Sequence, residues 1–396
     1  LNSITISFRI SLFCSNFVIN NIYYIDLFQM KIRHILFCAT ALFSAFLYSA
    51  NGNVISMTTD GDHSPAAKIT EFRPGELWKD TDGVAINAHG GGIMFHGGKY
   101  WWYGEYKTEG EAGNLAQVGV SCYSSDDLYN WKNEGIALAV SDEPGSDIER
   151  GCILERPKVI YNALTGKFVM WFHLELKGSG YSSARSGIAV ADRPEGPFSF
   201  VRSTRAVPGK WPFNKDEFPD EKGFLARDFE SGQMSRDMTL FVDDDGKAYQ
   251  LSASEDNWTL HIAELTDDYL DYTGKYVRVF PDRLMEAPAI FKKDGTYYFM
   301  GSGCTGWAPN AARSASAPSI WGPWTELGNP CEGEGSQLTF NSQSTFILPV
   351  AGKENTFIYM GDRWNPKNAI DGRYVWLPIE FDGDRFKIHW RDSWGF

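Results

Sequence analysis

The feature of this sequence that most constrains its fold is a pattern that occurs five times along the chain. Each copy contains one or two polar residues, an apolar run, a turn, and a second run rich in aromatic residues. The turns carry Gly, Asn or Asp, as tight β-hairpins require. The copies span residues 88–105, 155–173, 236–253, 286–303 and 342–362. Repeated hairpins with almost no helical periodicity predict an all-β chain folded as a five-bladed β-propeller.

The repeat also predicts where a functional site lies. The first strand of each propeller blade lines the central axis, so residues at the starts of these strands converge on one funnel. The aligned positions are His89, Glu155, Asp237, Glu286 and Gln343. Glu286 is the most informative of them, because a carboxylate directly before an Ala-Pro step at the mouth of a strand has little packing purpose.

Charge and composition restrict the partner. The formal net charge of -13 argues against a nucleic acid or an anionic membrane surface, because both bind basic patches. A neutral oligosaccharide or polysaccharide fits better. The 14 Trp, 18 Tyr and 27 Phe favour strands and supply flat platforms for sugar rings. Trp307 and Trp364 follow inner strands, where each could stack on a sugar or pack between blades.

Several carboxylates and aromatic walls around one funnel, without the spacing of a zinc site, indicate glycoside hydrolysis. That reaction needs an acid to protonate the leaving oxygen, and a second group to activate water or to attack directly. Glu286 is the natural acid, if partial burial and a neighbour such as Asp237 raise its pKa. Glu155 is a third carboxylate, and the adjacent Arg156 could hold it ionised.

At this point the motifs resemble those of a known family. The segments "RDMTLF", followed by "VDDDGKAY", and "EAP" at 286–288 look like the third-blade and fourth-blade motifs of glycoside hydrolase family 43. The resemblance covers about residues 70–396 and implies an inverting, five-bladed propeller enzyme. The segments "ERPKVIYN", "TGWAPN", "NSQSTFIL" and "DRWNPKNAIDGRYVWLPIEF" are closer to the branch that contains exo-β-1,3-galactanases and related exo-galactosidases.

One departure from the family concerns the base. Most members carry an aspartate base in the first blade, whereas the matching stretch of this chain, 88–92, has no carboxylate. The galactanase-like branch shares this loss, and there the resemblance implies that Gln343 acts as the base. It also implies that Glu286 is the acid, that Asp237 tunes the pKa of Glu286, and that Glu155 binds the sugar or the water. An amide is a poor base by ordinary pKa arguments. The alternatives are Glu155 through a water, Glu105 and Glu255, and sugar contacts are expected from His89, Glu105, Glu255, Trp307 and Trp364.

The sequence therefore predicts an exo-acting, inverting glycoside hydrolase that releases galactose from the non-reducing ends of β-1,3-linked, arabinogalactan-type chains. One alternative is an α-L-arabinofuranosidase or β-galactofuranosidase with the same chemistry. Another is a non-catalytic carbohydrate-binding propeller, although a pure binder has no use for a tuned acid. No cofactor and no catalytic metal are predicted, and a structural cation in the central channel stays open.

The N-terminal part predicts export. Residues 30–52 combine a basic start, an apolar run and small residues, as in a secretory signal peptide. Cleavage would leave a periplasmic or extracellular protein without a membrane span. Residues 1–29, before Met30, are interpreted as non-native upstream translation. Residues 53–68 are interpreted as an N-terminal tail, and residues 69–396 as the propeller glycosidase domain.

Four cysteines follow the predicted signal peptide, namely Cys122, Cys152, Cys304 and Cys331. An exported protein can oxidise them, and four cysteines allow three complete pairings. Buried free thiols are an equally good interpretation. Neither the pairing nor the oligomeric state follows from the sequence.

Overall fold

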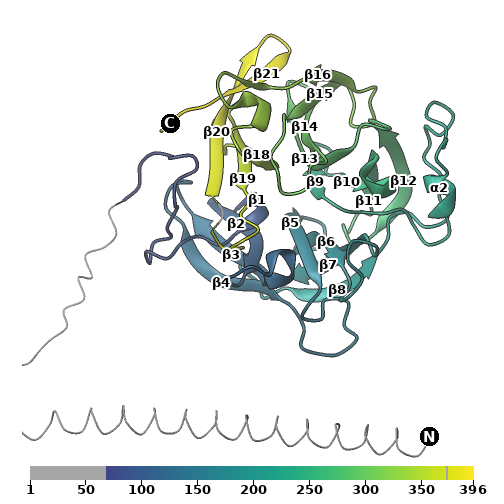
Figure 1. Ribbon diagram of the computed structural model, residues 1–396, viewed down its shortest axis with the longest axis horizontal. Coiled ribbons are helices and arrows are strands. Elements are labelled where there is room, and N and C mark those ends of the chain that lie inside the picture. Colours follow the sequence, from purple (N-terminus) through teal and green to yellow (C-terminus); the bar gives the residue numbers. More distant parts are fainter. Residues whose placement is uncertain (1–67, 372) are drawn as a thin grey trace, which may run out of the picture. The chain divides into compact units, whose positions relative to one another are not determined.

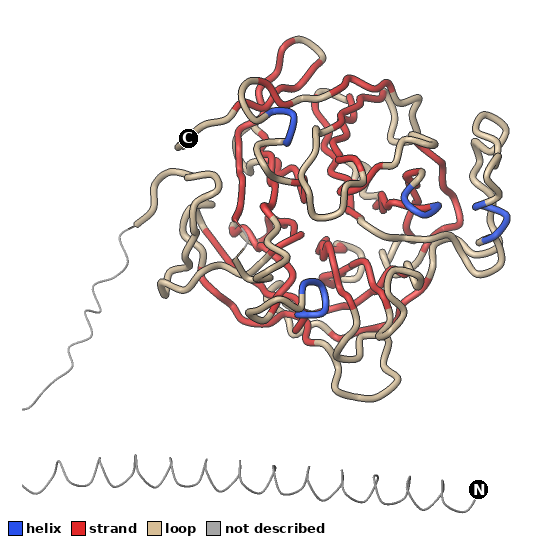
Figure 2. Tube along the Cα trace, viewed as in Figure 1, coloured by secondary structure: helices blue, strands red, loops and turns tan. Residues whose placement is uncertain are grey.

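The computed structural model describes residues 68–371 and 373–396, and in this part of the chain the strands form five sheets around a common axis (Figure 1; Figure 2). Each sheet is an antiparallel meander of four strands, and the fifth sheet carries one additional short strand. The blades follow one another around the ring in chain order. The predicted all-β, five-bladed β-propeller is therefore confirmed.

The elements have the following bounds. Blade one contains β1 (His89–His96), β2 (Lys99–Lys107), β3 (Gln117–Ser125) and β4 (Lys132–Ala139). Blade two contains β5 (Ile153–Asn162), β6 (Lys167–Glu175), β7 (Arg185–Ala191) and β8 (Ser199–Thr204). Blade three contains β9 (Met238–Val242), β10 (Ala248–Ser254), β11 (Thr259–Leu265) and β12 (Tyr272–Val279). Blade four contains β13 (Met285–Lys293), β14 (Thr296–Gly303), β15 (Arg313–Ala317) and β16 (Thr325–Gly328).

Blade five contains β18 (Gln343–Pro349), β19 (Phe357–Arg363), β20 (Arg373–Asp382) and β21 (Arg385–His389). The short strand β17 (Cys331–Glu332) adds to β21 in parallel. The helical pieces among the described residues are short, namely α2 (Phe224–Arg227) and the 3-10 turns η2 (Gly113–Ala116), η3 (Glu255–Asn257) and η4 (Ser336–Leu338).

Aromatic side chains close the ring between blades five and one. Phe72, near the start of the described chain, pairs through its backbone with Trp394 near the end. Their rings lie 4.4 Å apart, centre to centre. The same apolar cluster includes Trp102 of blade one and Trp376 of blade five, and both side chains are fully buried. Large buried aromatics of this kind supply much of the packing energy, so most of the Trp residues belong to the core.

The inner strands of four blades carry β-bulges at the end that faces the predicted funnel. The pairing register shifts between His89 and Gly92 in β1, Glu155 and Lys158 in β5, Glu286 and Ala289 in β13, and Ser344 and Phe346 in β18. In the first three strands the residue after the predicted site residue is left-handed, with φ of 62° at Gly90, 56° at Arg156 and 53° at Ala287. A bulge bends its strand and re-aims the neighbouring side chain. In β5 and β13 it turns Glu155 and Glu286 towards the axis.

Each of these three bulges is fixed by a carboxylate from the preceding blade. The contacts are Gly90 N to Asp362 Oδ2 at 2.5 Å, Arg156 N to Glu105 Oε1 at 3.0 Å and Ala287 N to Asp237 Oδ2 at 3.0 Å. A buried N–H without a partner would cost about 1–3 kcal/mol. The positions of the funnel residues therefore depend on contacts between neighbouring blades.

Three predictions concern the N-terminal part of the chain. The upstream segment 1–29, the signal peptide 30–52 and the tail 53–68, apart from Lys68, lie outside the described residues. Among the residues that are described, no helix is long and apolar enough to span a membrane.

The four cysteines are unpaired, which agrees with the free-thiol interpretation. Cys122, Cys152 and Cys331 are buried, and burial raises the pKa of each thiol. Cys304 is half-buried beside Glu286, and its pKa is raised to about 12 by burial and then by the charge of that carboxyl.

Candidate active site

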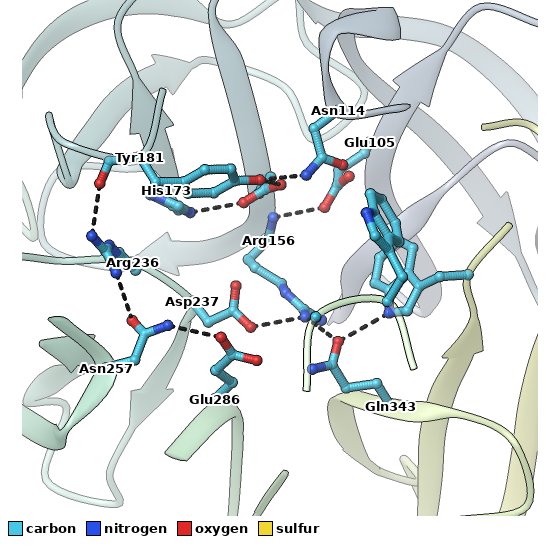
Figure 3. A pocket seen from close by; sticks show the side chains of 14 residues that line it. Glu105, Asn114, Arg156, His173, Tyr181, Arg236, Asp237, Asn257, Glu286 and Gln343 are labelled. Atoms are coloured by element: carbon cyan, nitrogen blue, oxygen red, sulfur yellow. Dashed lines mark hydrogen bonds and ion pairs between the residues drawn. The ribbon is translucent and has the colours of Figure 1, made fainter. Parts of the chain in front are cut away.

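A pocket of about 310 Å³ opens where the five inner strands converge (Figure 3). Every blade contributes to its lining, which consists of Glu105, Asn114, Glu155, Arg156, His173, Tyr181, Arg236, Asp237, Asn257, Glu286, Gly306, Trp307, Gln343 and Trp364. A second cavity of about 300 Å³ adjoins the pocket at Gly306, Trp307, Gln343 and Trp364. Of the site residues predicted from the sequence, only His89 and Glu255 lie outside the lining of the first pocket.

Glu286 has the properties of a carboxyl group that keeps its proton near neutral pH. Its side chain stands at the mouth of β13, where Asn257 Nδ2 donates to Oε1 at 2.7 Å. Burial raises its pKa to about 7, together with the nearby charge of Asp237 and against the opposing charge of Arg156. A general acid works best with a pKa near the working pH.

Arg156 connects the acid side of the pocket to the opposite side. Its guanidinium is buried, and Nη2 lies 2.9 Å from Asp237 Oδ2 and 2.6 Å from Gln343 Oε1. Nη1 also donates to the carbonyl of Ser344 at 3.2 Å. Because Asp237 Oδ2 additionally accepts the N–H of Ala287, the blade that carries Glu286 is tied to the same carboxylate. Asp237 therefore raises the pKa of Glu286 and also fixes its position.

The amide of Gln343 is held in one orientation. Its Oε1 accepts from Arg156 Nη2 at 2.6 Å and from Trp364 Nε1 at 2.9 Å, and its Nε2 donates to Ser302 Oγ at 3.0 Å. Guanidinium and indole groups are donors only. The oxygen of the amide must therefore face Arg156 and Trp364, while its nitrogen faces the other way.

Glu155 is held ionised by a buried histidine. His173 Nδ1 lies 3.0 Å from Glu155 Oε2, and His173 Nε2 lies 2.9 Å from Glu175 Oε1. Burial lowers the pKa of His173, but its two carboxylate partners outweigh this effect and raise that pKa to about 9. Burial likewise raises the pKa of Glu155, but hydrogen bonding and the charge of His173 outweigh it, so the pKa of Glu155 is lowered. Tyr181 also donates its hydroxyl to Glu155 Oε1 at 2.7 Å.

Glu105 lines the pocket, but its oxygens have structural partners. Oε1 accepts the N–H of Arg156 at 3.0 Å, and Oε2 lies 2.8 Å from Lys107 Nζ. The side chain is 1% exposed. Glu105 therefore holds the bulge of β5 in place, and little of it faces the pocket.

The two predicted aromatic residues lie together at the boundary between the two cavities. Trp307 and Trp364 meet edge to face, with ring centres 6.1 Å apart. The Arg156 guanidinium lies 5.2 Å from the centre of the Trp364 ring, within the range of a cation–π contact. Trp307 is 41% exposed, so its ring offers the more accessible surface for a sugar.

His89 and Glu255 are placed elsewhere. His89 is 1% exposed and stacks on Tyr374, with ring centres 5.0 Å apart, so its imidazole is packed behind the pocket. Glu255 is also 1% exposed, and both of its oxygens bind Arg278. The physical reason is a left-handed turn at 255–257, which directs the Glu255 carboxylate into blade three.

Arg156 was expected only as the partner of Glu155, and six further lining residues were not predicted from the sequence, namely Asn114, His173, Tyr181, Arg236, Asn257 and Gly306. His173 could have been found, because the hairpin of β5 and β6 places it directly opposite Glu155. The others lie in loops or turns, or, like Arg236, just before an inner strand, and no periodic pattern marks them.

Glu155, His173 and Asp237 bring one ligand atom each to within 4.8 Å of one another, a spacing that could hold a metal ion. Protein cations already balance the charge there. His173 is protonated at neutral pH, and Arg156 is paired with Asp237 at 2.9 Å. A further cation would have to compete with both.

Comparison with known proteins gives the following matches. The family model described as "Glycosyl hydrolases family 43" matches residues 92–363. A solved family 43 β-1,3-galactosidase, in complex with galactodeoxynojirimycin, is 55% identical, with a TM-score of 0.78 over 82% of this chain and 100% of the other. A point variant of an exo-β-1,3-galactanase from Phanerochaete chrysosporium, solved with β-1,3-galactotriose, is 33% identical, with a TM-score of 0.70 over 83% of this chain and 68% of the other.

Among curated proteins, a β-D-galactofuranosidase from Aspergillus niger is 23% identical over 234 residues. The match covers 57% of this chain and 60% of that protein. This chain therefore spans about three-fifths of the length of that relative.

Proposed function

The chain belongs to glycosyl hydrolases family 43, and from that premise we propose that it is an inverting, exo-acting β-1,3-galactosidase. Its substrate would be a β-1,3-linked galactan of the arabinogalactan type, from which it releases galactose at the non-reducing end. The 55% identity to a β-1,3-galactosidase whose whole length is covered supports this choice of sugar and linkage.

The observation that carries the proposal is a pair of carboxyl groups in one pocket whose pKa values are moved in opposite directions. Burial and Asp237 raise the pKa of Glu286 to about 7. Although burial raises the pKa of Glu155, the hydrogen bond and charge of His173 lower it overall. Two carboxyl groups whose pKa values differ in this way are suited to act as the acid and as the ionised partner in glycoside hydrolysis.

In the proposed reaction, Glu286 gives its proton to the glycosidic oxygen while the bond from that oxygen to the anomeric carbon breaks. A water attacks the anomeric carbon from the opposite face and gives its proton to the carboxylate of Glu155. The sugar product carries the inverted configuration. Exchange of protons with solvent then returns Glu286 to the acid and Glu155 to the carboxylate form.

Gln343 has a different role in this proposal from the one implied by the family resemblance. The imidic tautomer of an amide carries a proton on its oxygen, and that O–H would need an acceptor. Arg156 and Trp364 both present N–H groups to Gln343 Oε1, so they favour the ordinary amide. We therefore assign Gln343 to orienting the water or the sugar through its remaining N–H, and proton removal to Glu155.

Export is part of the same proposal and rests on the signal-like segment 30–52. A polysaccharide substrate is found outside the cytoplasm, and an acidic protein does not bind the anionic surface of a membrane.

A β-galactofuranosidase is the second candidate, because the curated relative from Aspergillus niger has that activity by name. A galactofuranosidase would use the same acid and the same attacking water, but its pocket would have to bind a sugar with a five-membered ring. The 23% identity of that relative supports it less than the galactosidase neighbour supports the first candidate.

Initial rates on a substrate panel distinguish these candidates. The panel contains β-1,3-galactobiose and the p-nitrophenyl glycosides of β-galactopyranose, β-galactofuranose and α-L-arabinofuranose. We expect the highest kcat/KM on β-1,3-galactobiose, and from longer β-1,3-linked chains galactose as the only small product at early times. A higher kcat/KM on either furanoside would overturn the choice of sugar, and release of internal fragments from longer chains would overturn exo action.

A further inference from the structure

The described residues contain two runs of three consecutive left-handed residues other than glycine, at 255–257 and at 339–341. Both adjoin the pocket. The first run ends at Asn257, which contacts Glu286, and the second immediately precedes Ser342 and Gln343. Such a conformation is unfavourable for residues with side chains. A chain keeps it only where other contacts impose it, and such sites cluster where function needs exact placement.

The turn at 255–257 is imposed by buried ion pairs. Arg278 binds both oxygens of Glu255, from Nε at 2.8 Å and from Nη2 at 2.7 Å. His261 Nε2 and Thr259 Oγ1 add contacts at 2.8 and 3.1 Å. The carboxylate of Asp256, the next residue, lies 2.6 Å from Nη1 of Arg227, the last residue of α2. The turn is therefore clamped at two successive carboxylates.

The third residue of the turn, Asn257, points into the pocket (Figure 3). Its Nδ2 donates to Glu286 Oε1 at 2.7 Å, and its Oδ1 lies 3.4 Å from Arg236 Nη1. Since a guanidinium only donates, the Asn257 oxygen must face Arg236. The amide N–H groups are thereby directed at Glu286.

This contact selects between the two oxygens of the acid. A protonated carboxyl has one carbonyl oxygen, which accepts hydrogen bonds, and one hydroxyl oxygen, which donates. An N–H aimed at Oε1 makes Oε1 the carbonyl oxygen and leaves the proton on Oε2. An N–H donor also favours the ionised form of a carboxyl. Asn257 therefore opposes the rise in the pKa of Glu286 while it fixes the position of the proton.

We propose that Asn257 is a positioning residue for the general acid, and that the left-handed turn anchored by Glu255 exists to present it. The inference rests on the proposed function, because it assigns Glu286 as the acid. It also gives Glu255 a role that does not involve the substrate.

The test compares two galactosides whose leaving groups differ in their need for an acid. The leaving group of β-1,3-galactobiose is a sugar hydroxyl, which departs poorly without protonation. The leaving group of 2,4-dinitrophenyl β-galactopyranoside is dinitrophenolate, which departs with little protonation. For Asn257→Ala we expect kcat/KM on galactobiose to fall by about 10–100-fold, a part of the 10²–10⁴-fold typical of general acids. The loss on the dinitrophenyl galactoside should be at least about tenfold smaller. The alkaline limb of the pH profile should also move to higher pH, because a donor to the ionised form is lost.

Asn355→Ala is the matched control. Asn355 is also left-handed, with φ of 53°, but it is exposed in the loop between β18 and β19. Its substitution should change neither the ratio of the two rates nor the pH profile. Asn257→Asp is a second variant, in which the side chain keeps its shape. Aspartate tolerates a left-handed backbone much as asparagine does, so the turn should be kept. It should also slow galactobiose more than the aryl galactoside, and it should move the alkaline limb further upwards.

Equal losses on the two galactosides in Asn257→Ala and Asn257→Asp, with an unmoved alkaline limb, would overturn the inference and make Asn257 a simple sugar ligand. That result requires a wild type that hydrolyses both galactosides. A wild type that hydrolyses neither would instead contradict the proposed function, so the two failures are separable.

Discussion

Replacing Glu286 with Gln is expected to lower kcat on β-1,3-galactobiose by about 10³-fold, within the range measured for general acids. The substitution keeps the size of the side chain and an oxygen that can accept from Asn257, but it removes the transferable proton. Initial rates of galactose release measure the effect. Glu326→Gln is the matched control, because Glu326 pairs with Arg283 at the exposed edge of the same blade. A Glu286→Gln variant that keeps more than about a tenth of the wild-type rate would contradict the assignment of the acid.

The stability of the same variant separates catalysis from folding. The folded-state pKa of Glu286, about 7, lies above the value of 4.5 for an unperturbed Glu. The wild type therefore has a contribution to stability that is present below the unfolded pKa and is lost as the pH rises through about 7. Above that pH a buried carboxylate destabilises the fold by at most about 3 kcal/mol. Glu286→Gln should accordingly be more stable than the wild type near pH 8, and this advantage should disappear near pH 5.

Replacing Arg156 with Met is expected to lower the free energy of unfolding by about 3–5 kcal/mol, because it leaves buried charge without its partner. Asp237 would lose its ion pair, and Gln343 Oε1 would lose one of its two donors. Met fills a similar volume, so the effect reports mainly the lost charge and hydrogen bonds. Denaturant unfolding measures it, and kcat on galactobiose should fall as well, because the relative positions of Glu286 and Gln343 depend on this guanidinium.

Arg150→Met provides the comparison for Arg156. Arg150 pairs with Asp142 at 2.7 Å, with 55% and 78% of the two side chains exposed. Exposed pairs of this kind contribute little to stability, so Arg150→Met should unfold at nearly the same denaturant concentration as the wild type. If Arg156→Met and Arg150→Met lower the free energy of unfolding by the same amount, the buried contacts of Arg156 with Asp237 and Gln343 do not stabilise the fold as proposed.

Much of the fold could be predicted from the repeat alone, because hairpin turns and the two-residue period of strands are local signals. The positions of Glu286, Asp237, Glu155 and Gln343 followed from the same alignment, since the first strands of the blades share one axis. The bulges that aim Glu155 and Glu286 did not follow from it. They depend on carboxylates of neighbouring blades, such as Glu105 and Asp237, and these contacts join residues far apart in sequence.

The turn at 255–257 shows why the remaining part of the site could not be predicted from the sequence. The segment "EDN" after a strand offers three polar side chains. From the sequence alone, the carboxylate of Glu255 is as suitable a sugar ligand as the amide of Asn257. The left-handed backbone buries Glu255 and presents Asn257. That choice is made by Arg278, on the outer strand of the blade, rather than by any local preference.

Inversion at the anomeric carbon is tested by the anomeric form of the first product. Wild-type protein is mixed with β-1,3-galactobiose, and proton NMR spectra are recorded before mutarotation equilibrates the released galactose. We expect α-galactose to appear first, because water attacks opposite the leaving oxygen while Glu286 protonates it. If β-galactose appears first, the reaction retains configuration and a carboxylate of the pocket must act as a nucleophile. That result would contradict both the inverting mechanism and the assignment of Glu155 as the base.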